Sequence, residues 1–359
     1  MPEKCRTEDP QVVGTAVEAQ AQDYVYAEKD KFVQLVGQED YHERIAQVKG
    51  ECFREYRRLW DRAGRFEVET PVPLHVDFEL STYCNYRCPM CPFGVPKGKR
   101  PATFDQVSGW FPFDLFRKVI DEGVPRGLKA IDLSYYNEPL LRDDLIDFIA
   151  YANHRGVLDI MSSTNGEFLT EEMTEALLDS GLTRLLVSLD ANTEPTFEKI
   201  RIGGNFKKVV GNVEYFLRRK RERKQTLPIT RVSFVKTKLN ENELGAFVEH
   251  WKSLVDYISI QELIEFDEMK LDLTPETRIQ NETFSCHQPW HRLTLRANGD
   301  ALPCCTIWGQ QLPMGNVREQ SLEEIWRSPK MIELRRLHRE GHYYDNPVCR
   351  KCAESSVAR

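Results

Sequence analysis

The chain has 359 residues, of which 41% are hydrophobic, and it carries a formal net charge of -7 with a pI near 5.8. This length suits one large domain plus a smaller one, and the acidic balance argues against nucleic acid or an anionic membrane surface as the main partner. No stretch approaches eighteen consecutive apolar residues and residues 1–14 lack the apolar segment of a secretory signal, so we expect a cytoplasmic protein without a membrane span.

The first 70 residues carry no recognisable motif, and we expect them to form an N-terminal helical extension. Residues 17–33 and 41–60 read as two helices, and the second has Ile45, Val48, Phe53, Tyr56 and Trp60 at spacings that can make one apolar face. The two cysteines of this region, at positions 5 and 52, are expected to be free thiols in a reducing compartment.

From residue 71 to residue 270 the pattern alternates between strand and helix. Strands are predicted at 74–80, 128–135, 158–162, 184–189, 229–236 and 258–263, and helices at 114–122, 143–154, 170–180, 196–200, 206–221 and from 240. Asp114 is a candidate N-cap, Gly123 a stop signal, and Asn240 with Glu243 a capping box. Six strands alternating with helices predict a parallel α/β sheet with right-handed crossovers, whose functional groups collect at the C-terminal strand ends.

The first predicted strand runs into the octapeptide CNYRCPMC, which places Cys84, Cys88 and Cys91 in one short loop. Structural zinc closes with four ligands, and a cluster that only transfers electrons normally takes four cysteines. Three cysteines spaced C-x3-C-x2-C leave one iron of a four-iron cluster open to a substrate or cosubstrate. A zinc site would need a distant fourth ligand, and structural zinc favours paired C-x2-C units.

This spacing closely resembles the signature of the radical S-adenosylmethionine (radical SAM) superfamily. The resemblance implies a partial (β/α)6 parallel barrel in which the three cysteines hold a 4Fe-4S cluster and the open iron binds S-adenosylmethionine. Reduction of its sulfonium then releases a 5′-deoxyadenosyl radical, for which a cellular reductant such as flavodoxin or ferredoxin is expected to supply the electron. The superfamily usually has an aromatic residue before the third cysteine, against the adenine. Met90 stands there in this chain, and its polarizable side chain can still pack on a ring.

The second and third strands end in turns that resemble two further superfamily motifs. Residues 135–139 read YYNEP, which is similar to the Gly-Gly-Glu-Pro motif with the glycines replaced. The resemblance assigns Glu138, with groups around Asn137, to the amino group of the methionine moiety, although Asn-Glu-Pro is also an ordinary turn. Asn165 belongs to a Thr-Asn-Gly turn, which is common in the superfamily and is equally explained by the tolerance of Asn and Gly for positive φ.

The fourth strand ends near Ser188 and Asp190, and Arg201 follows eleven residues after Asp190. This resembles a Ser-x-Asp…Arg pattern in which serine and arginine reach the carboxylate or ribose of the cofactor. An arginine suits a carboxylate because its planar fork pairs with both oxygens. Asp190 has a second interpretation, as a cap of the following helix.

After residue 270 the alternation stops and a second set of cysteines begins. Asn298-Gly299 is a strong hairpin signal, so residues 292–296 and 301–304 should pair and bring Cys286 close to Cys304. A capping box from Ser321 to Glu324 then introduces a short helix.

The C-terminal succession resembles the SPASM and twitch auxiliary-cluster domains of radical SAM enzymes. The resemblance implies a second 4Fe-4S cluster held by Cys286, Cys304, Cys349 and Cys352, within a domain spanning 271–359 that follows a helical extension (1–70) and a radical SAM barrel (71–270). A four-cysteine zinc knuckle would use similar spacing. Cys305 is left over. It can replace Cys304, pack as a small buried residue, or donate a hydrogen atom to a substrate.

Together these features predict an oxidoreductase that removes a hydrogen atom from a small polar substrate, resembling a sugar or aminocyclitol. In the dehydrogenase version an alcohol or amine becomes a ketone or imine and the auxiliary cluster accepts an electron. In the epimerase version Cys305 returns hydrogen to the opposite face. A peptide-modifying radical enzyme and a noncatalytic iron-sulfur or zinc module are the alternatives. The sugar-like substrate rests on resemblance of the C-terminal spacing to the radical dehydrogenase family acting on aminocyclitols.

Overall fold

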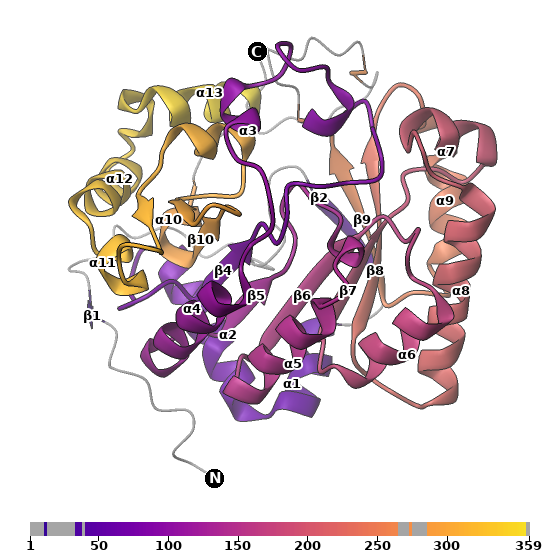
Figure 1. The fold of residues 1–359 in the computed structure, drawn as a ribbon, viewed down its shortest axis with the longest axis horizontal. Helices are drawn as coiled ribbons and strands as arrows, with labels where there is room; N and C mark the ends of the chain where they lie inside the picture. Colours follow the sequence, from indigo (N-terminus) through magenta and orange to yellow (C-terminus); the bar gives the residue numbers. More distant parts are fainter. Residues whose placement is uncertain (1–10, 13–32, 38–39, 265–272, 275–285, 357–359) are drawn as a thin grey trace.

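A single ten-stranded sheet organises the protein in the computed structural model, which describes residues 11–12, 33–37, 40–264, 273–274 and 286–356 (Figure 1). The strand order is β12-β11-β10-β4-β5-β6-β7-β8-β9-β2. Its centre is the predicted parallel series, formed by β4 (His75–Phe78), β5 (Ala130–Asp132), β6 (Asp159–Thr164), β7 (Arg184–Ser188), β8 (Ile229–Lys236) and β9 (Tyr257–Glu262). The sheet does not close on itself, so the predicted partial parallel barrel is confirmed.

Segments from both ends of the chain extend this sheet. β10 (Arg292–Leu295) pairs in parallel with β4, and β11 (Asp300–Leu302) and β12 (Gly315–Asn316) follow antiparallel. The predicted C-terminal hairpin is therefore confirmed, and it continues the barrel sheet. At the other edge β2 (Val33–Gly37) pairs antiparallel with β9. The prediction that a helix reaches residue 33 is wrong there, and residues 17–32 of that helix lie outside the described part.

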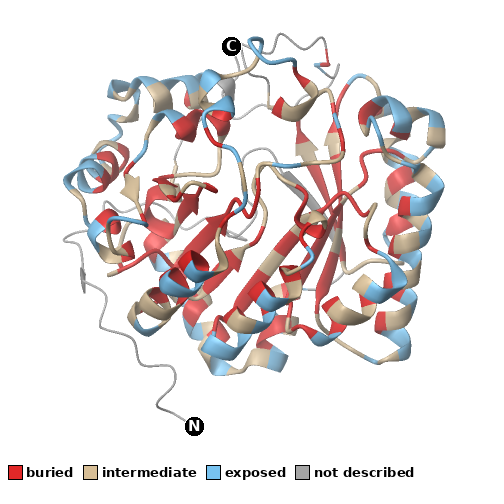
Figure 2. Ribbon diagram, viewed as in Figure 1, coloured by how far each residue is buried: buried red, intermediate tan, exposed pale blue. Residues whose placement is uncertain are grey.

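The two faces of the sheet differ in polarity. Val76, Ile131 and Ile160 point to the outer face, where helices cover the strands and form the main apolar core (Figures 1 and 2). The residues that alternate with them point inward, and among these Asp77 and Asp132 are register partners on β4 and β5. Parallel strands buried on both faces are normally continuous hydrophobic runs. A polar inner face therefore indicates an interior built to hold polar groups.

The remaining elements are helices and short strands. They are β1 (Gln11–Val12), α1 (Tyr41–Lys49), α2 (Glu51–Gly64), β3 (Val68–Glu69), α3 (Ala102–Asp105), α4 (Phe113–Arg126), α5 (Leu145–Arg155), α6 (Glu171–Asp179), α7 (Glu194–Ile200), α8 (Phe206–Glu222), α9 (Leu244–Trp251), α10 (Gln288–His291), α11 (Leu322–Trp326), α12 (Pro329–Arg339) and α13 (Pro347–Ser356). Within the described part, no helix has the length and apolar character needed to cross a membrane.

The helix predicted at 41–60 is two helices, α1 and α2, separated at Gly50, whose φ of 79° favours glycine. Val48 is exposed and does not share the buried apolar face. The ring of Trp60 on α2 stacks on His291 with centroids 4.0 Å apart, so this pair of helices is fixed against the segment that leads into β10. Cys52 forms a disulfide, which overturns the expectation of a free thiol at that position, while residue 5 lies outside the described ranges.

Some predicted helix ends also differ from the observed ones. Pro112 is the N-cap of α4, and Asp114 lies in the first turn instead. Gly123 lies inside α4, where an added Cβ would stand 2.9 Å from Leu128, so close packing explains this glycine better than helix termination.

The two predicted capping boxes have different outcomes. Asn240 precedes a 3-10 turn without capping by its side chain, and Glu243 accepts hydrogen bonds from the backbone of Asn192 and Thr193, so the box at 240–243 is wrong. The box from Ser321 to Glu324 is confirmed at the start of α11.

Arg142 ties the end of β4 to the start of α4. Its buried guanidinium donates to the carbonyls of Leu80 (2.8 Å) and Phe111 (3.0 Å) and pairs with Asp144. We expect Arg142→Met to lower the free energy of unfolding by about 3 kcal/mol, because two buried carbonyls lose their donor. Urea unfolding followed by circular dichroism measures this change.

The matched control is Arg155→Met, which removes a half-exposed ion pair with Asp121 and should cost less than about 1 kcal/mol. Equal losses in the two variants would show that the carbonyl contacts of Arg142 contribute nothing specific.

Candidate active site

The loop that follows β4 is folded into consecutive tight turns around its three cysteines. The Cys91 amide donates to the Cys88 carbonyl (2.9 Å), and the Gly94 amide donates to the Cys91 carbonyl (2.8 Å). A Cβ at position 94 would lie 2.1 Å from the Cys88 oxygen, so only glycine allows this close approach. Local backbone packing therefore shapes the loop that carries Cys84, Cys88 and Cys91.

The sulfur atoms of this loop lie in an environment that disfavours thiolates unless a cation is bound. Burial raises the pKa of Cys84 to about 11 and that of Cys91 to about 12, and it also raises the pKa of Cys88. Arg201 offers partial compensation, since its Nη1 lies 3.6 Å from the Cys88 Sγ. Metals bind the thiolate and release its proton. Three thiols in one tight loop, with Cys88 buried and the other two half-buried, therefore fit the cysteine set of an iron-sulfur cluster. No group of three His, Cys, Asp or Glu side chains in the described ranges is arranged to hold a single metal ion.

Glu138 is a buried carboxylate surrounded by hydrogen-bond donors. It accepts from the Thr164 hydroxyl (2.6 Å) and from the amides of Asn165 (2.7 Å) and Leu140 (3.0 Å). Burial raises its pKa to about 7, although these hydrogen bonds and the charge of Arg201 oppose that rise. The structure thus brings Glu138 and Asn165 together across the ends of β5 and β6.

The two asparagines of the predicted site have different surroundings. Asn165 donates its side-chain amide to Asn85 of the cysteine loop (2.8 Å), which joins the third strand end to that loop. Asn137 accepts from the amide of Tyr135 (2.9 Å), while its Nδ2 is buried without a hydrogen-bond partner. An unpaired buried donor beside Glu138 is available to a bound ligand. Met90 is half-buried against the main apolar core.

The fourth strand end places Arg201 between two of the predicted site residues. Its guanidinium forms an ion pair with Asp190 and contacts Cys88, and its Nε is buried without a partner. Asp190 has a positive φ of 62° and also accepts from the Val235 amide (2.8 Å). Asp190 therefore holds Arg201 and does not cap α7, whose N-cap is Thr193. Ser188 is the last residue of β7, half-buried on the inner face.

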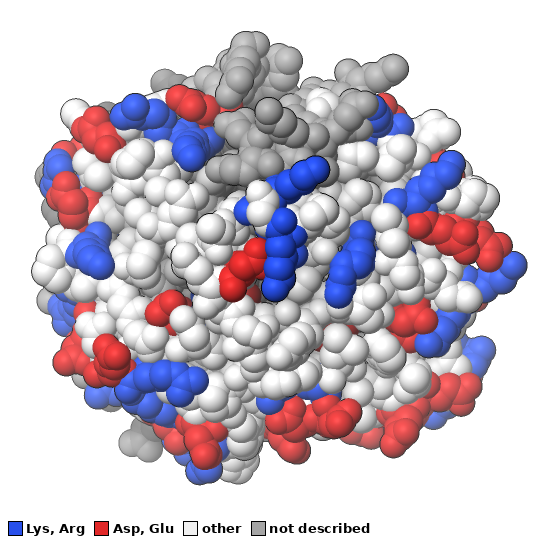
Figure 3. Space-filling model, turned by 45° about the horizontal axis from the view of Figure 1, so that its top comes forward, with Lys and Arg blue, Asp and Glu red and all other residues white. Residues whose placement is uncertain are grey.

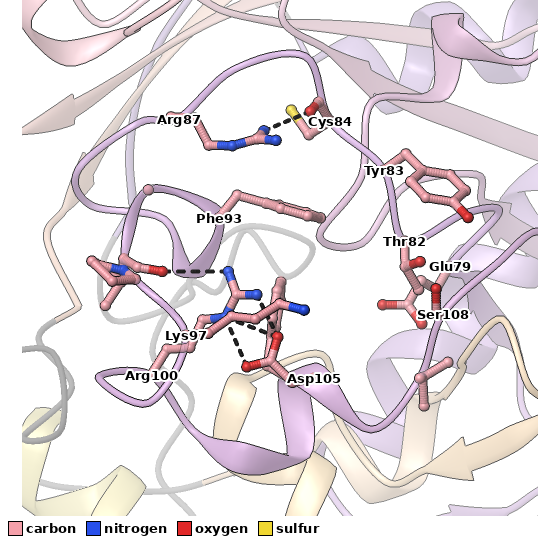
Figure 4. Close-up of a pocket in the computed structure, with 15 residues that line it drawn as sticks. Glu79, Thr82, Tyr83, Cys84, Arg87, Phe93, Lys97, Arg100, Asp105 and Ser108 are labelled. Atoms are coloured by element: carbon pink, nitrogen blue, oxygen red, sulfur yellow. Dashed lines mark hydrogen bonds and ion pairs between the residues drawn. The ribbon is translucent and has the colours of Figure 1, made fainter.

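A cavity of about 560 Å³ opens beside the cysteine loop (Figure 4). Cys84 lines it, together with Arg87, Lys97, Arg100 and Asp105. Figure 3 shows acidic and basic side chains mixed over one face of the molecule, with basic side chains gathered near its centre. All lining residues come from residues 79–108, so Glu138, Ser188 and Arg201 face elsewhere.

The C-terminal cysteines gather from three separate segments. Cys286 precedes α10, Cys304 follows β11, and Cys349 and Cys352 lie one helical turn apart on α13. Burial raises the pKa of Cys349, and the nearby Cys304 and Cys286 raise it further. His338 Nε2 lies 3.3 Å from the Cys349 Sγ. The structure therefore brings three of the four predicted auxiliary ligands close enough to interact electrostatically.

Tyr136 stands at the first glycine position of the Glu138 motif, and Tyr135 precedes it. Burial raises the pKa of Tyr136, and Cys91, Cys305 and Cys304 raise it further, so this ring is near both sets of cysteines. The Tyr135 hydroxyl donates to the Thr306 carbonyl (3.2 Å). These contacts connect the end of the second strand of the parallel series to the C-terminal domain. The resemblance to the Gly-Gly-Glu-Pro motif assigns no such role to the tyrosines.

Cys305 follows Cys304 directly and, like it, raises the pKa of Tyr136. It is half-buried, and the Arg292 Nη1 lies 4.0 Å from its Sγ. Because Arg292 begins β10 and faces the interior of the barrel, this thiol is close to the inner face of the sheet.

The sequence analysis did not predict that the inner face of the sheet is polar. Its signal was present in the strands, since His75-Val76-Asp77 alternates polar and apolar residues where a fully buried parallel strand would be apolar throughout. The residues concerned become neighbours only through strand pairing.

Comparison with known families identifies the two domains that carry these cysteine groups. The family model "Radical SAM superfamily" matches residues 78–249, and the model "SPASM: Iron-sulfur cluster-binding domain" matches residues 286–353. The chain is a radical SAM superfamily enzyme. It carries a C-terminal SPASM domain, and the resemblance stated from the sequence is confirmed. Radical SAM domains use a 4Fe-4S cluster and S-adenosylmethionine, and a SPASM domain adds auxiliary iron-sulfur binding.

Full-length relatives agree with this radical SAM assignment. The S-adenosyl-L-methionine-dependent 2-deoxy-scyllo-inosamine dehydrogenase of Niallia circulans is 24% identical over 293 residues, covering 79% of this chain and 93% of the relative. The structure of BtrN in complex with AdoMet and 2-DOIA superposes with a TM-score of 0.50 at 19% identity, over 77% of this chain and 92% of that one. Streptococcus suis SuiB bound to S-adenosylmethionine gives 0.57 at 14% identity, over 79% and 72%. At these identities the structural likeness establishes the fold alone.

Glu138 should make the binding of S-adenosylmethionine depend on pH. Because its pKa is about 7, the ionised fraction rises from about one tenth to about nine tenths between pH 6 and pH 8. S-adenosylmethionine should therefore bind the reconstituted enzyme more tightly as the pH rises, and Glu138→Gln should bind weakly without this pH dependence. Anaerobic calorimetry measures both effects.

Glu175→Gln is the matched control, because Arg219 holds the pKa of that exposed carboxylate below its usual range and it stays ionised throughout. A Glu138→Gln enzyme that keeps the wild-type pH profile would exclude Glu138 as the titrating group.

Gly94 should be required for the cysteine loop to bind iron. Gly94→Ala should distort the loop at a cost of about 1–3 kcal/mol, because the new methyl group meets backbone that cannot move aside. The measurements are iron content after reconstitution and thermal unfolding, both of which should fall. Gly211→Ala, which faces open space on α8, should retain its iron. Normal iron content in Gly94→Ala would show that the loop tolerates the Cβ.

Proposed function

We propose that this radical SAM enzyme dehydrogenates a hydroxyl-bearing carbon of a small, polar, sugar-like or aminocyclitol-like substrate. The substrate loses one hydrogen atom, one proton and one electron, so that its alcohol becomes a ketone. The polar inner face of the barrel carries this proposal, because Asp132 and Arg292 line a charged cavity in the interior that suits a hydroxylated molecule. The N. circulans relative, which is a dehydrogenase by name, supports the reaction type.

We assign the metal-binding residues within the same proposal. Cys84, Cys88 and Cys91 would hold the first 4Fe-4S cluster, and because they are only three they would leave one iron without a protein ligand. When bound, that cluster and S-adenosylmethionine supply the hydrogen-abstracting radical. Glu138 would accept hydrogen bonds from the amino group of the cofactor, and Asn137 would donate its unpaired Nδ2 to the same ligand.

Cys286, Cys304, Cys349 and Cys352 would hold the auxiliary cluster that receives the substrate electron. The proximity of the first three supports this assignment, and Tyr136 is near both cysteine groups. A small redox protein such as flavodoxin or ferredoxin would supply the first electron from outside.

Epimerisation is the second candidate function, and the position of Cys305 is the observation that favours it. The thiol is half-buried and contacts Arg292, which lines the interior. Cys305 would then return a hydrogen atom to the opposite face of the same substrate carbon.

Product mass and deuterium incorporation test the two candidates. We expect anaerobic turnover of candidate sugars to give a product two mass units lighter, with stoichiometric 5′-deoxyadenosine. An unchanged mass in ordinary water, with one stable deuterium gained in heavy water, would instead assign epimerisation. Under the dehydrogenase reading Cys305→Ala retains turnover, whereas under the epimerase reading it stops inversion and permits 5′-deoxyadenosine formation.

Cys88→Ala is the matched control for the assay. It should abolish 5′-deoxyadenosine formation if Cys88 holds the first cluster. Undiminished formation of this product would reject the assignment of the loop cysteines.

A further inference from the structure

A second cavity, of about 200 Å³, lies in the barrel interior at the end opposite the cysteine loop. Its walls are the first residues of several strands, including His75, Asp159 and Arg184, and α2 covers it with Tyr56 and Trp60. Functional groups of parallel α/β folds normally collect at the other, C-terminal strand ends. A charged cavity at the N-terminal ends therefore needs its own explanation.

Among the described residues that line this cavity, arginines outnumber acidic side chains. Arg184 and Asp159 satisfy each other through two hydrogen bonds of 3.1 and 2.5 Å, and Arg292 pairs with Asp77 behind the wall at 3.4 Å. Two lining arginines are left, Arg57 of α2 and Arg231 of β8, and neither has an ion-pair partner in the described ranges. Asp132 is the remaining acidic residue of the lining.

Arg231 is the more confined of the two arginines. Its guanidinium lies 5.8 Å from the centre of the Tyr257 ring, and its Nε is buried without a hydrogen-bond partner. The Arg57 guanidinium lies over the rings of Tyr56 and Trp60 and makes one long hydrogen bond, 3.5 Å, to the Tyr56 hydroxyl. Both arginines are half-buried and lack an acidic partner in the described ranges, so a bound anion would supply the missing counter-charge.

Asp132 adds a different chemistry to the same cavity. Its carboxylate accepts hydrogen bonds from the amide and hydroxyl of Ser134 and is in no ion pair within the described part. A carboxylate that accepts hydrogen bonds suits a hydroxyl group on the ligand. The combination of two arginines and one aspartate thus matches an acid group attached to a hydroxylated carbon skeleton.

A row of small side chains separates this cavity from the cofactor end of the barrel. Ser188, Ser233 and Ser259 are register partners on β7, β8 and β9, one inward position beyond Arg231. The Ser259 hydroxyl is buried without a hydrogen-bond partner. Short hydroxyl side chains leave room in the interior, and Ser188 lies at the strand end where the cofactor is proposed to bind.

We infer that the substrate carries an acid group, a phosphate or a carboxylate, which Arg231 and Arg57 bind at the closed end of the barrel. Its hydroxylated part then extends past the serines toward the cysteine loop. Arginine forks pair with both kinds of acid group through two hydrogen bonds. This inference rests on the proposed function and sharpens its substrate class, from polar sugars in general to acidic sugar derivatives.

Binding measurements on the reconstituted holoenzyme test the inference without requiring turnover. The probes are inorganic phosphate, glucose 6-phosphate, glucuronate, glucosamine and glucose, each titrated by anaerobic calorimetry. We expect at least one acidic probe to bind, and Arg231→Gln to weaken it by about tenfold or more. Phosphate and glucose 6-phosphate binding would identify a phosphorylated ligand, whereas glucuronate binding alone would identify a carboxylate.

Two further variants separate recognition from folding. Arg231→Lys retains the charge and should recover part of the lost affinity, and Arg218→Gln, on the exposed side of α8, should bind the probes like wild type. The inference is overturned if glucosamine binds as tightly as the acidic probes, if none of the acidic probes binds, or if Arg231→Gln binds them normally.

A different measurement tests the proposed function independently of the acid group. Substrate-free cleavage of S-adenosylmethionine to 5′-deoxyadenosine requires the first cluster but not the acid group. We expect Arg231→Gln to retain this cleavage. Its absence from wild-type enzyme would contradict the radical chemistry whether or not the acidic probes bind.

Discussion

The structure depends on the parallel pairing of β10 with β4. Arg292 stands opposite His75 and Thr294 opposite Asp77, and the Thr294 hydroxyl donates to Asp77 at 2.8 Å. Burial alone would raise the pKa of Asp77, but Arg292, His75 and Thr294 together lower it to about 2. A buried carboxylate with three partners is therefore a junction at which the C-terminal segment joins the barrel, and breaking it would leave a charge without compensation.

This junction explains how two distant cysteine groups come to serve one interior. The loop that follows β4 carries the first group, and the hairpin that follows β10 leads directly to the second. β11 runs antiparallel to β10, and the loop after β11 then brings the Thr306 carbonyl to the Tyr135 hydroxyl beyond the end of β5. Tyr136 lies near both Cys91 and Cys304. Under the proposed function, an auxiliary cluster held there would accept the electron of a substrate bound inside the barrel.

The same sheet gives the interior its chemistry. Inward residues alternate with the apolar residues that support the helices, so each strand contributes polar groups without weakening the core. The interior changes along the barrel axis. Charged side chains line the end near α2, and the hydroxyl side chains of Ser188, Ser233 and Ser259 follow toward the cysteine loop. A fold of this kind hosts many reactions. The lining residues, rather than the architecture, therefore distinguish one substrate from another.

The sequence by itself determined the parallel α/β class, the cysteine loop and the C-terminal hairpin. Each rests on local signals: strand-helix alternation, the spacing of Cys84, Cys88 and Cys91, and the Asn298-Gly299 turn. Short-range geometry suffices for such features because the residues concerned are close along the chain.

Only the tertiary structure decided which distant residues share a site. The ion pair of Arg201 with Asp190, the pairing of β2 with β9, and the meeting of Arg57 with Arg231 in one cavity all depend on elements far apart in sequence. The end of the predicted helix at residue 33 became a strand because the edge of β9 offered backbone hydrogen bonds. Such contacts depend on the register and curvature of the whole sheet, which no local pattern records.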